Sequence, residues 1–154
     1  MDKKVKCLAA LSITCAAVAL LLAAQHPRTL GRHAVELPGT KPDMPFSRGI
    51  VVGNQLYVAG HAGYEPDGKL RPGGIGPETQ CALEQIKQVV EAAGFQMTDV
   101  VATTVYLADI KEWGDMNKVY KTFFPEPRPA RAAIQVTLGG GARVEISAIA
   151  VKAR

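Results

Sequence analysis

Alternating apolar and polar positions predict the strands of this chain. Residues 49–60 hold two β-rich runs, GIVV and QLYVAG, separated by Gly53 and Asn54. Glycine at the first turn position favours a two-residue type II′ turn, so the segment is expected to form a hairpin. Residues 100–107 (VVATTVYL) are rich in β-branched side chains and are expected to form a further strand.

The pattern returns near the carboxyl end of the chain. Residues 131–138 place Ala, Ile and Val at every second position, and residues 143–151 do the same after a Gly139–Gly141 turn. Both segments are therefore predicted strands. A shorter strand is expected around residues 34–37, where the apolar pattern is brief and prolines surround it.

Two segments have helical spacing instead. The first begins near Pro77, which suits the first position of a helix, and ends before Gly94, a residue suited to the left-handed conformation past a helix end. An apolar stripe runs along one side of it: Ala82, Ile86, Val89, Val90 and Ala93.

The second predicted helix follows Asp109-Ile-Lys-Glu112, which has the spacing of a capping box. It stops before Pro125, because proline cannot continue a helix. One side of it carries large apolar side chains, which we interpret as core: Trp113, Met116, Tyr120, Phe123 and Phe124.

The order of elements is a hairpin, a helix, a strand, a helix and two strands. It predicts an α/β (α+β) domain in which two helices cover one face of a mixed sheet. The other face is then left uncovered, and an apolar face of that width needs a partner. We therefore expect the chain to form oligomers.

The amino-terminal segment resembles an export signal. Lys3, Lys4 and Lys6 precede an uncharged apolar run, Cys7–Ala24. This pattern indicates a signal peptide at residues 1–24 or, if it is not cleaved, a membrane anchor formed by about residues 5–24. In both cases the rest of the chain is expected to be exported, either periplasmic or secreted, or held at the inner membrane.

The chain has 154 residues, enough for one domain beyond this segment. We predict a proline-rich linker at residues 25–43 and a single domain at residues 44–154. Removing residues 1–24 takes away three lysines and one aspartate, which lowers the net charge from +4 to +2. No basic stripe remains, so the charge pattern does not support a nucleic-acid partner.

Common catalytic motifs are absent from the sequence. The three histidines have no metal-ligand spacing with a cysteine or carboxylate, and no phosphate-binding loop or Gly-x-Ser-x-Gly motif occurs. Two charged residues stand out: Arg131 begins a strand after a proline-rich corner, and Glu145 lies within an apolar strand. Each has a functional interpretation and a structural one, since charges also occur at strand ends and sheet edges.

The chain resembles the RidA (YjgF, enamine/imine deaminase) family in four motifs: PARAA at 129–133, RVEISAIAV at 143–151, VEAAG at 90–94 and TTVYLAD at 103–109. The resemblance covers about residues 44–152. It implies a chorismate-mutase-like fold and a homotrimer whose sheets pack into a central barrel, with clefts between subunits. That trimer would cover the open sheet face.

The resemblance also implies an activity, the hydrolysis of enamine and imine acids such as 2-aminoacrylate to 2-keto acids and ammonia, without cofactor or metal. The family arginine maps onto Arg131, which would bind the substrate carboxylate in a two-pronged pair. The family carboxylate maps onto Glu145, which would hold the attacking water. The remaining expected substrate-binding residues are Phe46, Gly60, His61 and Ala133.

Four positions depart from the family pattern. Phe46 replaces a tyrosine, Ala59 a serine, Ala133 a cysteine and Ser147 a second glutamate. These changes leave an alternative open: a trimer of the same fold that binds carboxylate metabolites, or acts like a chaperone, without turnover. A different small-molecule reaction on the same fold is a third possibility.

Overall fold

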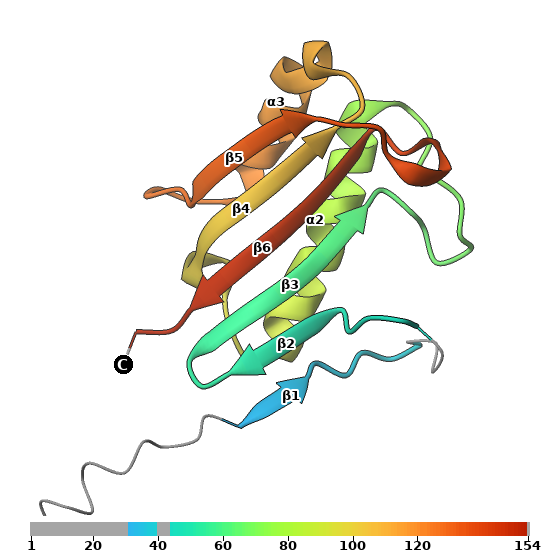
Figure 1. Cartoon of the computed structure of the whole chain (residues 1–154). Coiled ribbons are helices and arrows are strands. Elements are labelled where there is room, and N and C mark those ends of the chain that lie inside the picture. Colours follow the sequence, from blue (N-terminus) through green and yellow to red (C-terminus); the bar gives the residue numbers. More distant parts are fainter. Residues whose placement is uncertain (1–30, 40–43, 154) are drawn as a thin grey trace, which may run out of the picture. The chain divides into compact units, whose positions relative to one another are not determined.

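A single mixed sheet of six strands organises the part of the chain that the computed structural model describes, residues 31–39 and 44–153 (Figure 1). The sheet order is β1-β2-β3-β6-β4-β5. All neighbours are antiparallel except β4 and β5, which run parallel. The strands are β1 (Arg32–Ala34), β2 (Gly49–Val52), β3 (Gln55–Ala62), β4 (Val100–Leu107), β5 (Ala130–Gln135) and β6 (Val144–Val151).

The predicted hairpin is confirmed. Val52 pairs with Gln55 across a two-residue turn, and Gly53 has a φ of 60°, a conformation that glycine adopts without strain. The turn is also joined to the end of β6: Asn54 Nδ2 donates to the Lys152 carbonyl at 2.9 Å, and the Lys152 amide donates to the Asn54 carbonyl at 3.0 Å.

The short first strand lies earlier than predicted. It occupies Arg32–Ala34 rather than residues 34–37, because its partner β2 begins at Gly49. The Val35 amide donates the last hydrogen bond of the ladder to the Gly49 carbonyl, at 2.9 Å. The sheet thus includes residues from the segment expected to be a linker.

The long helix is α2 (Ile75–Ala92). It begins two residues before Pro77, which is possible because the first turn of a helix does not need the amide that proline lacks. Gly94 follows the helix with a φ of 75°, as predicted. The predicted stripe faces the sheet, and four of its members are fully buried: Ala82, Ile86, Val89 and Val90.

The second helix, α3 (Trp113–Phe123), follows a short 3-10 helix, η2 (Ile110–Glu112). Only half of the predicted capping box forms. The Asp109 side chain accepts from the Lys111 amide at 2.9 Å, whereas Glu112 binds Arg143 Nη1 at 2.6 Å. Two further 3-10 helices are η1 (Met97–Asp99) and η3 (Gly139–Gly141).

The aromatic stripe of α3 is core only in part. Met116, Tyr120 and Phe124 are buried, but Trp113 at the start of the helix is 39% exposed. The prediction that Trp113 belongs to the core is therefore wrong. The indole lies over the edge strand β5, where no further strand covers it.

Both helices pack on one side of the sheet; in Figure 1, α2 runs behind the strands. The opposite face keeps large apolar side chains in solvent, among them Tyr57 on β3, Ile149 on β6 and Ile134 on β5. The predicted arrangement of two helices on one face of a mixed sheet is confirmed. Residues 1–30 lie outside the described part of the chain, and within that part no helix is long and apolar enough to cross a membrane.

Candidate active site

Arg131 lies on the helix-covered side of the edge strand β5. Its register partner on β4 is Thr103, a buried residue that faces α3. The guanidinium lies 4.6 Å from the ring centre of Tyr120 and 5.7 Å from that of Trp113. Its Nη1 donates a 2.8 Å hydrogen bond to Asn117 Oδ1. Three side chains of α3 therefore hold the cation against the strand edge.

A buried hydrogen bond fixes the aromatic part of this arrangement. The hydroxyls of Tyr120 and Thr103 lie 2.7 Å apart. Burial raises the pKa of the Tyr120 phenol, so the hydroxyl is neutral at physiological pH. The ring face that Arg131 meets is thus anchored to β4.

The charge of Arg131 is not neutralised within the described residues. No Asp or Glu among residues 31–39 and 44–153 forms an ion pair with it. Two arginines near other carboxylates differ: Arg71 pairs with Glu65 and Glu84, and Arg143 pairs with Glu112. A guanidinium held in place by a neutral amide and two rings is suited to receive an external carboxylate.

Glu145 lies on β6 with its side chain on the uncovered face of the sheet. Its neighbours Val144 and Ile146 are fully buried on the helix side, so the alternation of the strand directs Glu145 the other way. The carboxylate covers Gly60 of β3. A Cβ at residue 60 would clash with Glu145 Oε1, so a glycine leaves room for the carboxylate.

The two charged residues are therefore not brought together within one chain. Arg131 is on β5 and faces α3, whereas Glu145 is on β6 and faces away from both helices. The strand β4 lies between them in the sheet. Two strand spacings of about 4.8 Å each and the thickness of the sheet separate their positions.

The other predicted site residues also lie in different places, some on the helix side of the sheet and some on the opposite side. Ala133 is on the helix side of β5, partly buried against the core, and Gly60 adjoins Glu145. Phe46, before β2, is 54% exposed. His61 is only 6% exposed: its Nδ1 lies 3.3 Å from Gln85 Oε1 of α2, and burial lowers its pKa. The structure thus places His61 beneath α2, apart from the face that carries Glu145.

Sequence reasoning missed Asn117 as a neighbour of Arg131 and assigned Trp113 and Tyr120 to the core alone. Positions 113, 117 and 120 share one face of a helix, so a polar residue within an aromatic stripe was a usable signal. What it contacts depends on the position of β5 next to α3.

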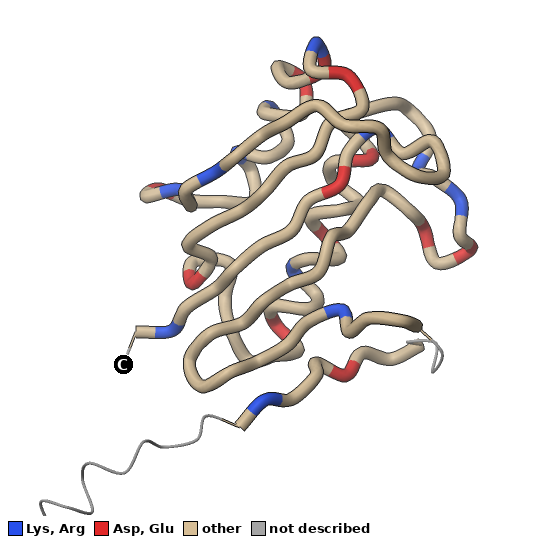
Figure 2. Tube along the Cα trace, in the orientation of Figure 1, with Lys and Arg blue, Asp and Glu red and all other residues tan. Residues whose placement is uncertain are grey.

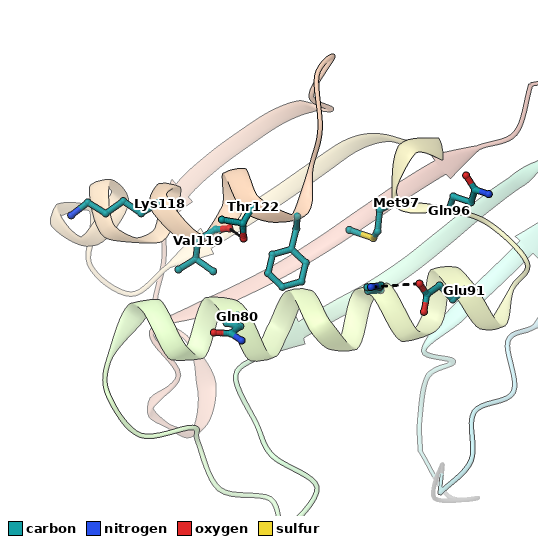
Figure 3. A pocket seen from close by; sticks show the side chains of 9 residues that line it. Gln80, Glu91, Gln96, Met97, Lys118, Val119 and Thr122 are labelled. Atoms are coloured by element: carbon teal, nitrogen blue, oxygen red, sulfur yellow. Dashed lines mark hydrogen bonds and ion pairs between the residues drawn. The ribbon is translucent and has the colours of Figure 1, made fainter.

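A separate hollow lies between α2 and α3 (Figure 3). It has a volume of about 700 Å³, and Met97, Val119 and Phe123 form its apolar part. Its lysines are already paired, Lys87 with Glu91 at 3.7 Å and Lys118 with Asp115 at 2.7 Å. It contains none of the predicted site residues. No group of three or more potential metal ligands occurs within the described ranges.

Comparisons with known proteins agree with the motifs and the fold. The family model described as endoribonuclease L-PSP matches residues 38–152. A rat 2-iminobutanoate/2-iminopropanoate deaminase is 46% identical over 109 residues, which cover 70% of this chain and 80% of that protein. A RutC family protein of Pyrococcus horikoshii is 42% identical over 114 residues, covering 73% and 90%.

Solved structures give the same result. Escherichia coli TdcF with bound serine is 30% identical with a TM-score of 0.72, covering 79% of this chain and 99% of that one. RidA from an Antarctic Psychrobacter is 34% identical with a TM-score of 0.69, covering 82% and 100%. The family match spans most of the chain, and the sheet order, the helices and the four motifs accompany it. The chain therefore belongs to the endoribonuclease L-PSP family, the RidA family of proteins.

Proposed function

We propose that this protein hydrolyses small 2-imino acids, such as 2-iminobutanoate and 2-iminopropanoate, to the corresponding 2-keto acids and ammonia. The observation that carries the proposal is Arg131, a guanidinium with no carboxylate partner in the described residues, held on two aromatic rings. Its free donors suit a planar carboxylate. The 46% identity to a protein with that activity in its name supports the same conclusion.

In the proposed reaction, Arg131 binds the substrate carboxylate and Glu145 accepts a proton from a water molecule. An enamine first becomes an imine by proton transfer to carbon. The water oxygen then bonds to the imine carbon while the nitrogen takes up the proton held by Glu145, giving a tetrahedral carbinolamine. The hydroxyl proton moves to the nitrogen, the carbon–nitrogen bond breaks with its electron pair leaving on ammonia, and the keto group forms.

We further propose that the active unit is a homotrimer in which Arg131 of one copy meets Glu145 of a neighbouring copy. Two features support an assembly of this kind. The uncovered sheet face carries Tyr57, Ile134 and Ile149 in solvent, and Arg131 and Glu145 lie on opposite faces of one sheet. The number three rests on the family resemblance. Light scattering should give three times the mass of the chain.

The activity is tested by measuring ammonia and keto-acid release from 2-aminoacrylate and 2-iminobutanoate generated enzymatically in the assay. Arg131→Ala should lower kcat/KM by at least about 100-fold, because it removes a charge-assisted pair of hydrogen bonds. Arg131→Lys should recover little, since an ammonium cannot form the two-pronged contact. Activity unchanged in both variants would overturn the assignment of Arg131.

The alternative is a trimer that binds carboxylate metabolites without turnover. A structural relative, TdcF, was solved with bound serine. This chain also has Ala59, Ala133 and Ser147 where the family has more polar or reactive side chains. A thermal shift with 2-oxobutanoate or serine that Arg131→Ala abolishes, without ammonia release by the wild-type protein, would favour this alternative.

We infer that the substrate of this chain is a small molecule rather than the RNA that the family name suggests. Lys and Arg are scattered among Asp and Glu over the turns, helices and strand ends (Figure 2). Arg128, three residues before Arg131, pairs with Glu126. RNA binding depends on clustered cations that neutralise phosphates, and the proposal assigns a small-molecule partner instead.

We propose that residues 1–24 direct the chain to export, either as a cleaved signal or as an uncleaved anchor. The support is the sequence pattern, three lysines before the apolar run Cys7–Ala24. Mass spectrometry of the amino terminus of the protein purified from its native cell distinguishes the two forms. Recovery of the full-length protein in the cytoplasmic fraction would contradict both.

A further inference from the structure

Asn117 is the one polar side chain that hydrogen-bonds the Arg131 guanidinium within the described residues. It lies one helical turn after Trp113 and one before Tyr120, so all three side chains project from the same face of α3. The rings limit the tilt of the guanidinium plane, and the amide oxygen fixes its rotation by accepting from Nη1 at 2.8 Å. The remaining N–H donors of the guanidinium have no hydrogen-bond partner among residues 31–39 and 44–153.

The choice of an amide at this position has an electrostatic consequence. A carboxylate of the same size would accept the same hydrogen bond, but it would also neutralise the guanidinium and compete with a substrate carboxylate. An amide carries no charge, so it orients the cation while leaving the charge uncompensated. A leucine of similar volume would leave the orientation unfixed.

We propose that Asn117 is the positioning residue of the carboxylate site: it holds Arg131 in one orientation without neutralising its positive charge. The site thereby becomes selective for carboxylate substrates. This inference rests on the proposed function. It assigns Asn117 no contact with the reacting atoms, so its replacement should change substrate binding more than the chemical step.

The test compares Asn117→Asp and Asn117→Leu with the wild-type protein in two measurements. One is KM and kcat for 2-iminobutanoate; the other is the dissociation constant for 2-oxobutanoate by calorimetry, which needs no turnover. Asn117→Asp should raise KM and the dissociation constant by about tenfold or more, and Asn117→Leu by about fivefold, with kcat changed less than about threefold. The midpoint of thermal unfolding should not fall in Asn117→Asp, because its new ion pair replaces the lost hydrogen bond.

Lys118→Gln is the matched control, because Lys118 is the adjacent residue of α3, is exposed and contacts Asp115 rather than Arg131. It should behave as the wild-type protein does. An unchanged KM and dissociation constant in both Asn117 variants would overturn the inference, as would a loss confined to kcat.

The outcomes separate this inference from the proposed function. If Arg131→Ala abolishes turnover but the Asn117 variants keep wild-type constants, only the role of Asn117 is wrong. If the wild-type protein binds 2-oxobutanoate without releasing ammonia from the imine, the deaminase proposal fails and the binding constants alone decide the role of Asn117. A wild-type protein that neither binds nor reacts would overturn both.

Discussion

Arg131 and Glu145 differ in how many of the groups around each side chain come from the same chain. Around Arg131, a single helix supplies an amide acceptor and two aromatic rings, and β4 anchors one of those rings through Thr103. Around Glu145, the described residues supply a glycine that makes room for the carboxylate and two register partners, Ala62 and Tyr106, on a face with exposed apolar side chains. The cation site is preorganised within one chain, whereas the carboxylate lies on the face that the proposed trimer would enclose.

The largest effect is expected when two inactive variants are mixed. Arg131→Ala and Glu145→Gln, co-expressed with different tags and purified as mixed oligomers, should recover about a quarter of wild-type kcat/KM from parents that each lose at least about 100-fold. A quarter is expected because one in four neighbouring pairs joins an intact arginine to an intact glutamate. No recovery above the parents would show that each site draws both residues from the same chain.

The glycine beside Glu145 offers a second test. Gly60→Ala should lower kcat by about tenfold, because the new methyl group displaces the carboxylate, while the free energy of unfolding falls by less than about 1 kcal/mol, since a flexible side-chain end can move. Stability is read from urea unfolding and kcat from ammonia release.

Gly63→Ala is its counterpart, because a Cβ there would lie 2.7 Å from the backbone Cα of Glu78. It should lose about 1–3 kcal/mol of unfolding free energy yet keep kcat per folded molecule. If Gly60→Ala behaved in the same way as Gly63→Ala, the space at residue 60 would be structural rather than catalytic.

The anchor of the Arg131 site is tested by Thr103→Val. This change leaves the buried Tyr120 hydroxyl without its partner and should cost about 1–2 kcal/mol of unfolding free energy. KM should rise less than about threefold, because Asn117 still holds the guanidinium. Thr122→Val, at an exposed position of α3, should stay within about 0.5 kcal/mol of the wild-type protein. If KM rose by more than threefold while the free energy of unfolding stayed unchanged, Tyr120 would itself be part of the substrate-binding surface.

The smallest expected effect concerns pH. Burial holds the pKa of His61 below its ordinary value of 6.5, so the unfolded chain binds a proton more readily than the folded one. The stability that His61 contributes is present above pH 6.5 and is lost as the pH falls below it, by up to about 1 kcal/mol at pH 5.5. His61→Gln should show a shallower loss of unfolding free energy between pH 7 and 5.5. If the unfolding free energy of the wild-type protein and of His61→Gln fell equally with pH, His61 would not be the source of the pH dependence.

Much of the fold could be predicted from local patterns, and the errors have physical causes. The hairpin at Gly53, the helix end at Gly94 and the buried stripe of α2 follow from backbone preferences and periodicity. The first strand lies earlier in the sequence than predicted because its position is set by where β2 begins. Glu112 does not complete the expected capping box because its carboxylate forms an ion pair with Arg143, which is distant in sequence.

The residues of the candidate site could be named from the sequence, but their positions relative to one another could not. Alternation along each strand places Arg131 with Ala133 on one face and Glu145 opposite its buried neighbours. Whether those two faces coincide depends on β5 running parallel to β4 at the sheet edge, and on β6 lying between β3 and β4. These long-range pairings have no signal within either strand, so the separation of Arg131 from Glu145 emerges only in the folded chain.

Two hydrogen bonds between Asn54 and Lys152, one from the Asn54 side chain and one between backbones, also affect the separation of Arg131 from Glu145. The two hydrogen bonds tie the last residues of β6 to the hairpin turn and so set how far β6 can slide along β3. A slip by one residue would exchange the two sides of the strand, sending the Glu145 carboxylate into the apolar layer under α2. The contact between Asn54 and Lys152 thus helps to keep Glu145 on the face of the sheet opposite the helices.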